Sequence, residues 1–125
     1  MILSPGDVIK VLCGQTGYAK YHLYVGLNHV GSLMFLYLNS ENGFKGDLIL
    51  DCVELPFLPK STTGETVLSF TAMPRFTADK LEKLGAIYYG RISTTVADKI
   101  RGHCPSIRTF GKAEKALLVA GAALM

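Results

Sequence analysis

The fold class is decided by a β-hairpin signal in the first third of the chain. The deciding stretch is Lys20-Tyr21-His22-Leu23-Tyr24-Val25-Gly26-Leu27, then Asn28-His29-Val30-Gly31, then the apolar run at 33–38. Successive side chains of a strand point to opposite faces, so Lys20 and His22 would share one face and Tyr21 and Leu23 the other. The Asn- and Gly-containing connection favours a hairpin turn. The apolar run that follows has the length of a central strand.

Outward from this hairpin, the front half of the chain has strand patterns and the back half changes period. Strands are expected at 7–13, 47–53, 66–70 and 86–92, separated by Gly, Asn and Pro. Helices are expected at 78–84, 96–103 and 112–124, the first capped by Thr77 and the second by a residue between Ser93 and Thr95. The pattern predicts a mainly β protein, a small antiparallel barrel with two or three short helices.

The composition indicates one folded domain, and the predicted barrel spans residues 1–125. Of the 125 residues, 49% are hydrophobic and 18% are charged, which suits a packed core. The net charge of +3 permits a polyanionic partner without requiring one. Apolar runs are too short for a membrane span, and the N-terminal residues lack the pattern of a signal peptide. We therefore expect a cytoplasmic protein with no membrane contact.

The cysteines and histidines give no metal or cofactor signal. Cys13, Cys52 and Cys104 are odd in number, far apart and without a C-x-x-C pair. The three histidines are scattered without ligand spacing. We expect reduced thiols, no metal and no cofactor.

Five residues are candidates for catalysis on two strands. Lys20 and His22 would place an amine and an imidazole on one strand face, where they could hold a phosphate and move a proton. Ser69 and Thr71 share a face at the end of a later strand, and Arg75 offers a permanent cation for a phosphorane-like transition state. The alternative interpretation is a solvated polar face, strand-end hydroxyls and a surface arginine.

Three further residues are candidates for substrate binding. Asn39 and Ser40 follow the most apolar strand and could line a cleft, although an Asx turn is the alternative. Arg91 belongs to a basic bias in the back half of the chain. That bias could follow a nucleic-acid backbone, or it could be the outer face of the helices.

The order of these segments resembles the MazF/PemK family of toxin endoribonucleases. The resemblance rests on four short motifs along most of the chain. They are Pro5-Gly6-Asp7-Val8-Ile9, Lys20-Tyr21-His22-Leu23-Tyr24-Val25, Val67-Leu68-Ser69 and Leu84-Gly85-Ala86-Ile87-Tyr88-Tyr89-Gly90-Arg91-Ile92-Ser93. The chain departs from the family pattern at Tyr21-His22, where Arg-Pro is common. It departs again at 70–74, which is apolar where the family is polar.

The resemblance implies an SH3-like barrel, usually a homodimer, that cleaves single-stranded RNA without metal and is inhibited by a protein antitoxin. In this chemistry the 2′-hydroxyl attacks its own phosphate and leaves a cyclic phosphate. By position, Lys20 or His22 would stand for the basic catalytic residue and Ser69 or Thr71 for the hydroxyl, with Arg75 as a second cation. The alternative function is a non-catalytic barrel, regulatory or antitoxin-like, that binds a protein partner or nucleic acid. The nuclease hypothesis predicts that Lys20, His22, Ser69, Thr71 and Arg75 meet in one groove.

Overall fold

The computed structural model describes residues 1–14, 16–40 and 46–125 of the chain. The strands of these residues are β1 (Asp7–Leu12), β2 (Ala19–Leu27), β3 (Leu33–Asn39), β4 (Leu48–Asp51), β5 (Glu65–Leu68), β6 (Arg75–Phe76) and β7 (Ile87–Arg91). The helices are α1 (Ala78–Lys83), α2 (Thr94–His103) and α3 (Lys112–Leu124), with two short 3-10 helices, η1 (Cys52–Glu54) and η2 (Cys104–Ser106).

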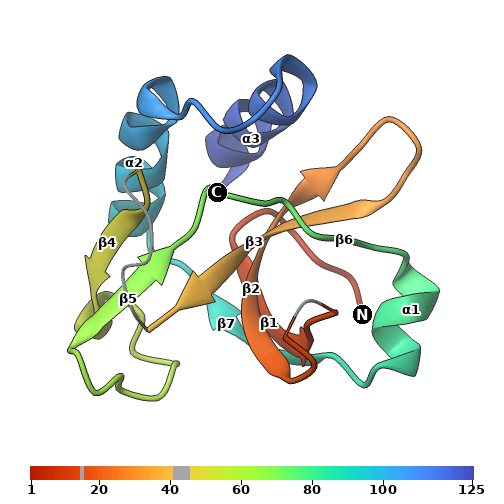
Figure 1. Cartoon of the computed structure of the whole chain (residues 1–125), viewed down its shortest axis with the longest axis horizontal. Helices are drawn as coiled ribbons and strands as arrows, with labels where there is room; N and C mark the ends of the chain where they lie inside the picture. Colours follow the sequence, from red (N-terminus) through yellow and green to blue (C-terminus); the bar gives the residue numbers. More distant parts are fainter. Residues whose placement is uncertain (15, 41–45) are drawn as a thin grey trace.

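The strands form one antiparallel sheet that is strongly curled into a half-barrel (Figure 1). Its order is β4-β5-β3-β2-β1-β7, and β6 pairs with the other end of β3. The predicted hairpin is the centre of this sheet, with His22 opposite Tyr37 and Leu23 opposite Leu36. The prediction of a mainly β chain with a small antiparallel barrel and short helices is confirmed.

The helices follow the predicted positions closely. Thr77 caps α1 by accepting a hydrogen bond from the Lys80 backbone N–H. Ser93 caps α2 through the Val96 N–H at 3.2 Å, and Thr94 is already helical, so the chain enters this helix two residues earlier than predicted. No helix of the described residues is long and apolar enough to cross a membrane.

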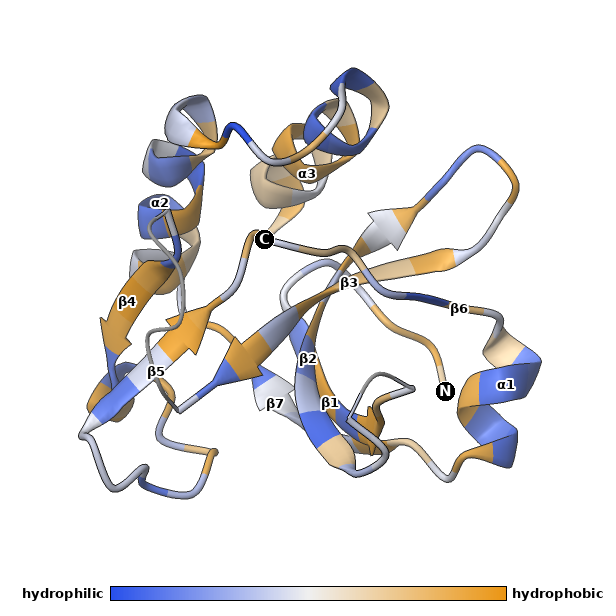
Figure 2. Cartoon of the chain, in the orientation of Figure 1, coloured by the Kyte–Doolittle hydropathy of each residue, from blue (hydrophilic) through white to orange (hydrophobic). Residues whose placement is uncertain are grey.

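Apolar side chains fill both sides of the central strands. One cluster contains Leu23, Val25 and Leu36 together with residues of α2 and α3. The second cluster contains Ile9, Tyr24 and Phe35, and it is covered by Leu81 of α1 and by Phe76 of β6. Figure 2 shows the apolar residues running along β3 and β4.

The second cluster corrects the expectation of a polar, solvent-facing side of β2. His22 is 0% exposed and Tyr24 is 5% exposed. Strand alternation separates the two faces correctly, but α1 and β6 supply a second layer that seals the face carrying His22. A two-residue strand such as β6 is too short to leave a periodic pattern in the sequence.

Helix α3 lies directly on β2, and a glycine makes the close approach possible. A Cβ atom at Gly121 would stand 2.2 Å from the Val25 carbonyl oxygen, so no larger residue fits there without a shift. Leu118 is fully buried and Ala122 is 1% exposed in the same interface. The apolar C-terminal segment therefore covers the barrel with its inner face.

Candidate functional site

A cleft of about 750 Å³ opens where β2 begins and β3 ends. The loop before β5 forms its opposite wall. Its lining includes Tyr18, Ala19, Lys20, Tyr21, Leu38, Asn39, Ser40, Leu58, Pro59, Lys60, Ser61 and Thr66. The cleft thus combines two lysines, two tyrosines and several hydroxyl groups.

The register of β2 and β3 sets the sides from which residues reach the cleft: Lys20 and Asn39 project to one face of the sheet, and Tyr21 and Leu38 project to the other. Tyr21 pairs with Leu38 and His22 with Tyr37, and the same register continued by one residue sets Lys20 opposite Asn39 on one face. The Lys20 Nζ atom stands 4.7 Å from the centre of the Tyr37 ring, a favourable cation–π arrangement. The aromatic ring beneath it therefore favours one position of the ammonium group.

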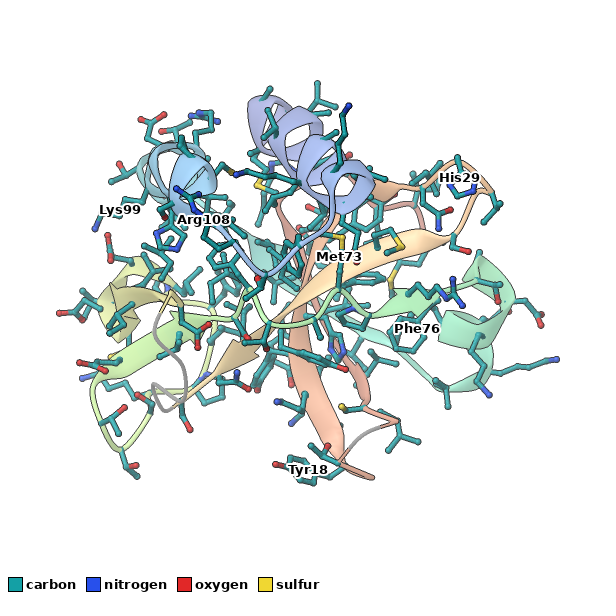
Figure 3. All side chains as sticks on the ribbon, turned by 45° about the horizontal axis from the view of Figure 1, so that its top comes forward. Tyr18, His29, Met73, Phe76, Lys99 and Arg108 are labelled. Atoms are coloured by element: carbon teal, nitrogen blue, oxygen red, sulfur yellow. The ribbon has the colours of Figure 1, made fainter. Side chains whose placement is uncertain are left out.

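The second lysine and the exposed tyrosine come from loops on either side. Lys60 follows Pro59 and is exposed. Tyr18 is 62% exposed, and Figure 3 shows it at the end of the molecule away from α2 and α3. The two residues flank the strand ends that carry Lys20 and Asn39.

Several polar groups of the cleft have no partner within the described part of the chain. The side chains of Asn39, Lys60 and Thr66 form no hydrogen bond or ion pair there. The rim between them is ordered, since Ser61 Oγ donates to the Glu65 carbonyl at 2.6 Å and Thr63 Oγ1 donates to the Ser40 carbonyl at 2.7 Å. An ordered rim with unpartnered amide, ammonium and hydroxyl groups suits a polar, anionic ligand.

His22 lies beneath this cleft rather than in it. Its Nδ1 atom is 2.8 Å from the Lys20 carbonyl oxygen, so Nδ1–H donates to that carbonyl. The rings of Phe35, Tyr37 and Phe76 surround it at 5.9, 5.0 and 5.7 Å between centres. Burial lowers the pKa of His22 to about 4, so the ring is neutral at pH 7. Because no part of it is exposed, it does not contact a ligand in the cleft.

Tyr37 connects the cleft with the buried residues. Its hydroxyl oxygen is 3.5 Å from the Cys13 thiol, and its ring carries the Lys20 ammonium group on one side. Burial is the main cause that raises the pKa of Tyr37, and the contact with Cys13 adds to it. Tyr37 therefore stays a neutral phenol that supports Lys20 from below.

Ser69 shares a face with His22 but stands two strands away. Its backbone N–H donates to the Tyr37 carbonyl at 2.9 Å, which sets Ser69 opposite Tyr37. The row His22–Tyr37–Ser69 thus spans two strand spacings, roughly 10 Å. Ser69 is 2% exposed, and its hydroxyl is 2.9 Å from that of Thr71, which is itself exposed. The two hydroxyls bond to each other, and neither lines the cleft.

The two arginines lie in other parts of the molecule. Arg75 is exposed on β6 and pairs with Met34, at the opposite end of β3 from Asn39. Arg91 is 3.3 Å from Asp7 Oδ1 and donates to the carbonyl oxygens of Leu124 and Met125 at the end of α3. Arg91 thereby holds the C-terminal helix against the barrel.

The structure therefore corrects the expectation of one shared groove. Lys20 lines the cleft with Asn39 and Ser40, whereas the remaining candidates lie outside it. His22 and Ser69 are buried and do not reach the cleft. Thr71, Arg75 and Arg91 belong to other segments of the chain, which lie outside the cleft. Among the described residues, no group of three His, Cys, Asp or Glu side chains could hold a metal ion.

Sequence reasoning identified three of the twelve described residues that line the cleft, Lys20, Asn39 and Ser40. Tyr18, Tyr21, Lys60, Ser61 and Thr66 were not singled out as site residues. Lys60 and Ser61 read as part of a polar connection, and only the fold brings that connection next to β2. The spacing of Tyr18 and Tyr21 around Lys20 was the one local signal available.

No protein-family profile matches the chain, and no curated protein matches it in sequence. The resemblance to the MazF/PemK family therefore rests on the short motifs alone and stays a hypothesis.

Proposed function

We propose that this protein binds single-stranded RNA in the cleft, as a non-catalytic or weakly catalytic barrel of the MazF/PemK type. The observation that carries the proposal is the state of Lys20 and Lys60. Within the described residues neither ammonium group forms an ion pair or a hydrogen bond, although both line the same cleft. Unpaired lysines in one cleft favour a polyanion, because binding releases the counterions of its phosphates.

The other groups of the cleft suit a single strand better than a duplex. An exposed tyrosine such as Tyr18 offers a flat surface for an unstacked base. The Asn39 amide and the Thr66 hydroxyl can bond to ribose or base edges, which a single strand exposes. The chain's net charge of +3 adds a weak general attraction.

Fluorescence anisotropy with a labelled 12-nucleotide single-stranded RNA tests this proposal. We expect Lys20→Ala and Lys60→Ala each to weaken binding about tenfold at low salt, since each removes a phosphate contact. Lys112→Ala is the matched control, because Lys112 is an exposed lysine on α3 without a contact among the described residues. Wild-type protein that does not bind the RNA, or a loss equal in all three variants, would contradict the proposal.

RNA cleavage is the second candidate function, and Lys20 favours it. The resemblance places the family's basic catalytic residue at Lys20 or His22, and of these only Lys20 reaches the cleft. In that reaction the 2′-oxygen bonds to the neighbouring phosphorus as the bond from phosphorus to the 5′-oxygen breaks, the 2′-hydroxyl proton passes to water and the leaving 5′-oxygen takes up a proton. The Lys20 ammonium group can stabilise the negative charge that develops on the phosphate. His22 has no part in that step because it is buried.

Product analysis separates cleavage from binding. Incubation with unlabelled RNA should give fragments that end in a 2′,3′-cyclic phosphate, and Lys20→Ala should abolish them. Intact RNA after prolonged incubation with protein that binds it would leave binding as the function and exclude cleavage. The antitoxin and the homodimer implied by the resemblance stay predictions.

A further inference from the structure

A surface of apolar, aromatic and lysine side chains adjoins the cleft on β1, β7 and the start of β2. We call it the shelf, and it consists of Lys10, Leu12, Tyr21, Ile87 and Tyr89. Leu12 is 41% exposed and Ile87 is 57% exposed, and the other three are half-buried. Lys10 pairs with Ile87 across β1 and β7, so the two side chains share a face.

The shelf is continuous with the cleft through the register of β1 and β2. Leu12 pairs with Ala19 and Lys10 pairs with Tyr21, and both Ala19 and Tyr21 line the cleft. Tyr21 lies on the face of β2 opposite to Lys20, so a ligand that contacts Tyr21 in the cleft reaches Lys10 on the same face by crossing one strand, about 5 Å.

The aromatic part of the shelf is held in place. The rings of Tyr21 and Tyr89 meet edge to face at 5.0 Å and 85°, and the Lys10 ammonium stands 5.2 Å from the centre of the Tyr21 ring. Burial, and then the hydrogen bond to Tyr89, raises the pKa of Tyr21. Rings held in place in this way lose less conformational freedom when a ligand binds.

We propose that the shelf is a nucleobase subsite for the RNA strand whose phosphates lie in the cleft. This inference rests on the proposed function and extends it: the site binds bases as well as phosphates and spans more than one nucleotide. Charge complementarity favours this occupant over an apolar protein surface. Lys10 borders the shelf, Lys20 and Lys60 line the adjoining cleft, and no Asp or Glu among the described residues lines that cleft.

The sequence provides a matched pair of variants on one strand. Tyr89 points to the shelf and contacts Tyr21, whereas its neighbour Tyr88 pairs with Ile9 on the other face and is 50% exposed. Tyr89→Ala removes an aromatic ring from the shelf, and Tyr88→Ala removes one from elsewhere on the same strand. Ile87→Ser is a second shelf variant that leaves the tyrosine pair intact.

The experiment compares two 12-nucleotide ligands of equal charge, one complete RNA and one abasic RNA that keeps the ribose and phosphates. We expect the wild-type protein to prefer the complete RNA. Tyr89→Ala should weaken binding of the complete RNA about tenfold, within the range known for removal of a stacking aromatic, and leave binding of the abasic RNA unchanged. Ile87→Ser should show the same selectivity to a smaller degree, and Tyr88→Ala should match the wild type.

Other outcomes overturn the inference in distinguishable ways. Equal affinity of wild-type protein for the two ligands, together with no effect of Tyr89→Ala or Ile87→Ser, would exclude a base subsite and leave phosphate binding in the cleft intact. A shelf variant that changes the oligomeric state in sedimentation but not the RNA affinity would assign the shelf to protein contact. Absence of RNA binding by the wild-type protein would overturn the proposed function and the shelf together.

Discussion

Two groups of cations in this molecule differ in what they contact. The helix-side cations are Arg91, Arg101, Arg108 and Lys115, and the cleft cations are Lys20 and Lys60. Every helix-side cation donates to a backbone carbonyl. Neither cleft lysine does so among the described residues.

The helix-side contacts are made to carbonyl groups of helices and turns. Arg101 Nη1 donates to the Ala122 carbonyl at 2.7 Å, and Lys115 Nζ donates to the Ile107 carbonyl at 3.1 Å. Arg108 Nη1 donates to the Pro105 carbonyl at 2.7 Å. Figure 3 shows Arg108 on the same side as α2. A carbonyl oxygen has two lone pairs, so it can accept such a bond in addition to one from the backbone.

These positively charged side chains therefore fall into two groups, one that contacts the backbone of the fold and one that does not. The basic bias of the back half suggested a nucleic-acid track, but Arg91, Arg101, Arg108 and Lys115 donate to backbone carbonyls of the fold. Lys112 forms no such bond among the described residues. The cleft lysines are fewer, and their charge is available to a ligand. We therefore expect substitutions in the first group to change stability and substitutions in the second group to change binding.

The largest effect on stability should come from protonation of His22, the buried residue beneath the cleft. Because the folded-state pKa of His22 is about 4 against an ordinary 6.5, unfolding takes up a proton between these pH values. Stability from this residue is complete above pH 6.5 and is lost as the pH falls towards 4, by about 3 kcal/mol in total. Urea unfolding at pH 7 and pH 4.5 should show a smaller acid loss for His22→Asn than for wild type.

RNA affinity gives the matching control for His22. We expect the RNA affinity of the wild-type protein to show no step near pH 6.5 that is absent from the His22→Asn variant. Such a step would mean that His22 titrates within reach of the ligand, and the separation of cleft and core would fail. An acid loss of stability equal in the two proteins would contradict the buried neutral state.

Arg91→Ala should have the next largest effect. The change leaves Oδ1 of Asp7 without its partner, which is costly because Asp7 is only 7% exposed. It also removes the hydrogen bonds to the carbonyl groups at the end of α3. We expect a loss of about 2 kcal/mol in the free energy of unfolding. Affinity for RNA, measured at a temperature where both proteins are folded, should not change. Weaker binding at unchanged stability would move Arg91 to the binding group.

Arg101→Ala should have a smaller effect of the same kind. It removes the bond to the Ala122 carbonyl and the exposed ion pair with Asp98, so we expect a loss of about 1 kcal/mol. Arg101→Gln, which can still donate to the carbonyl, should recover part of it. Equal losses in the two variants would contradict a stabilising role for the contact between Arg101 and the Ala122 carbonyl, because the ion pair with Asp98 lies within α2.

The sequence predicts the scaffold better than the site because strands and helices leave periodic patterns. The hairpin of β2 and β3 and the helix Lys112–Leu124 were predictable from alternation and from Ala- and Leu-rich composition. Alternation assigns His22 to a face, but it does not tell whether another layer covers that face. Here β6 and α1 cover it, which turns a candidate base into a core residue.

Three of the twelve described cleft residues were predictable and the others were not, for a similar reason. Lys20, Asn39 and Ser40 lie at strand ends, where polar residues after apolar ones stand out. Lys60 comes from a loop with no periodicity, and its position across from β2 depends on how β4 and β5 pair. Contacts between segments far apart in sequence carry no local pattern.

The salt dependence of RNA binding tests the central claim most directly. For a single strand, the slope of log affinity against log salt concentration falls by about 0.7 for each phosphate contact removed. The double variant Lys20→Ala/Lys60→Ala should lower this slope by about 1.4, whereas Arg101→Ala should leave it unchanged. A slope that Arg101→Ala lowers, or that the double lysine variant leaves intact, would contradict the assignment of these two lysines to the binding site.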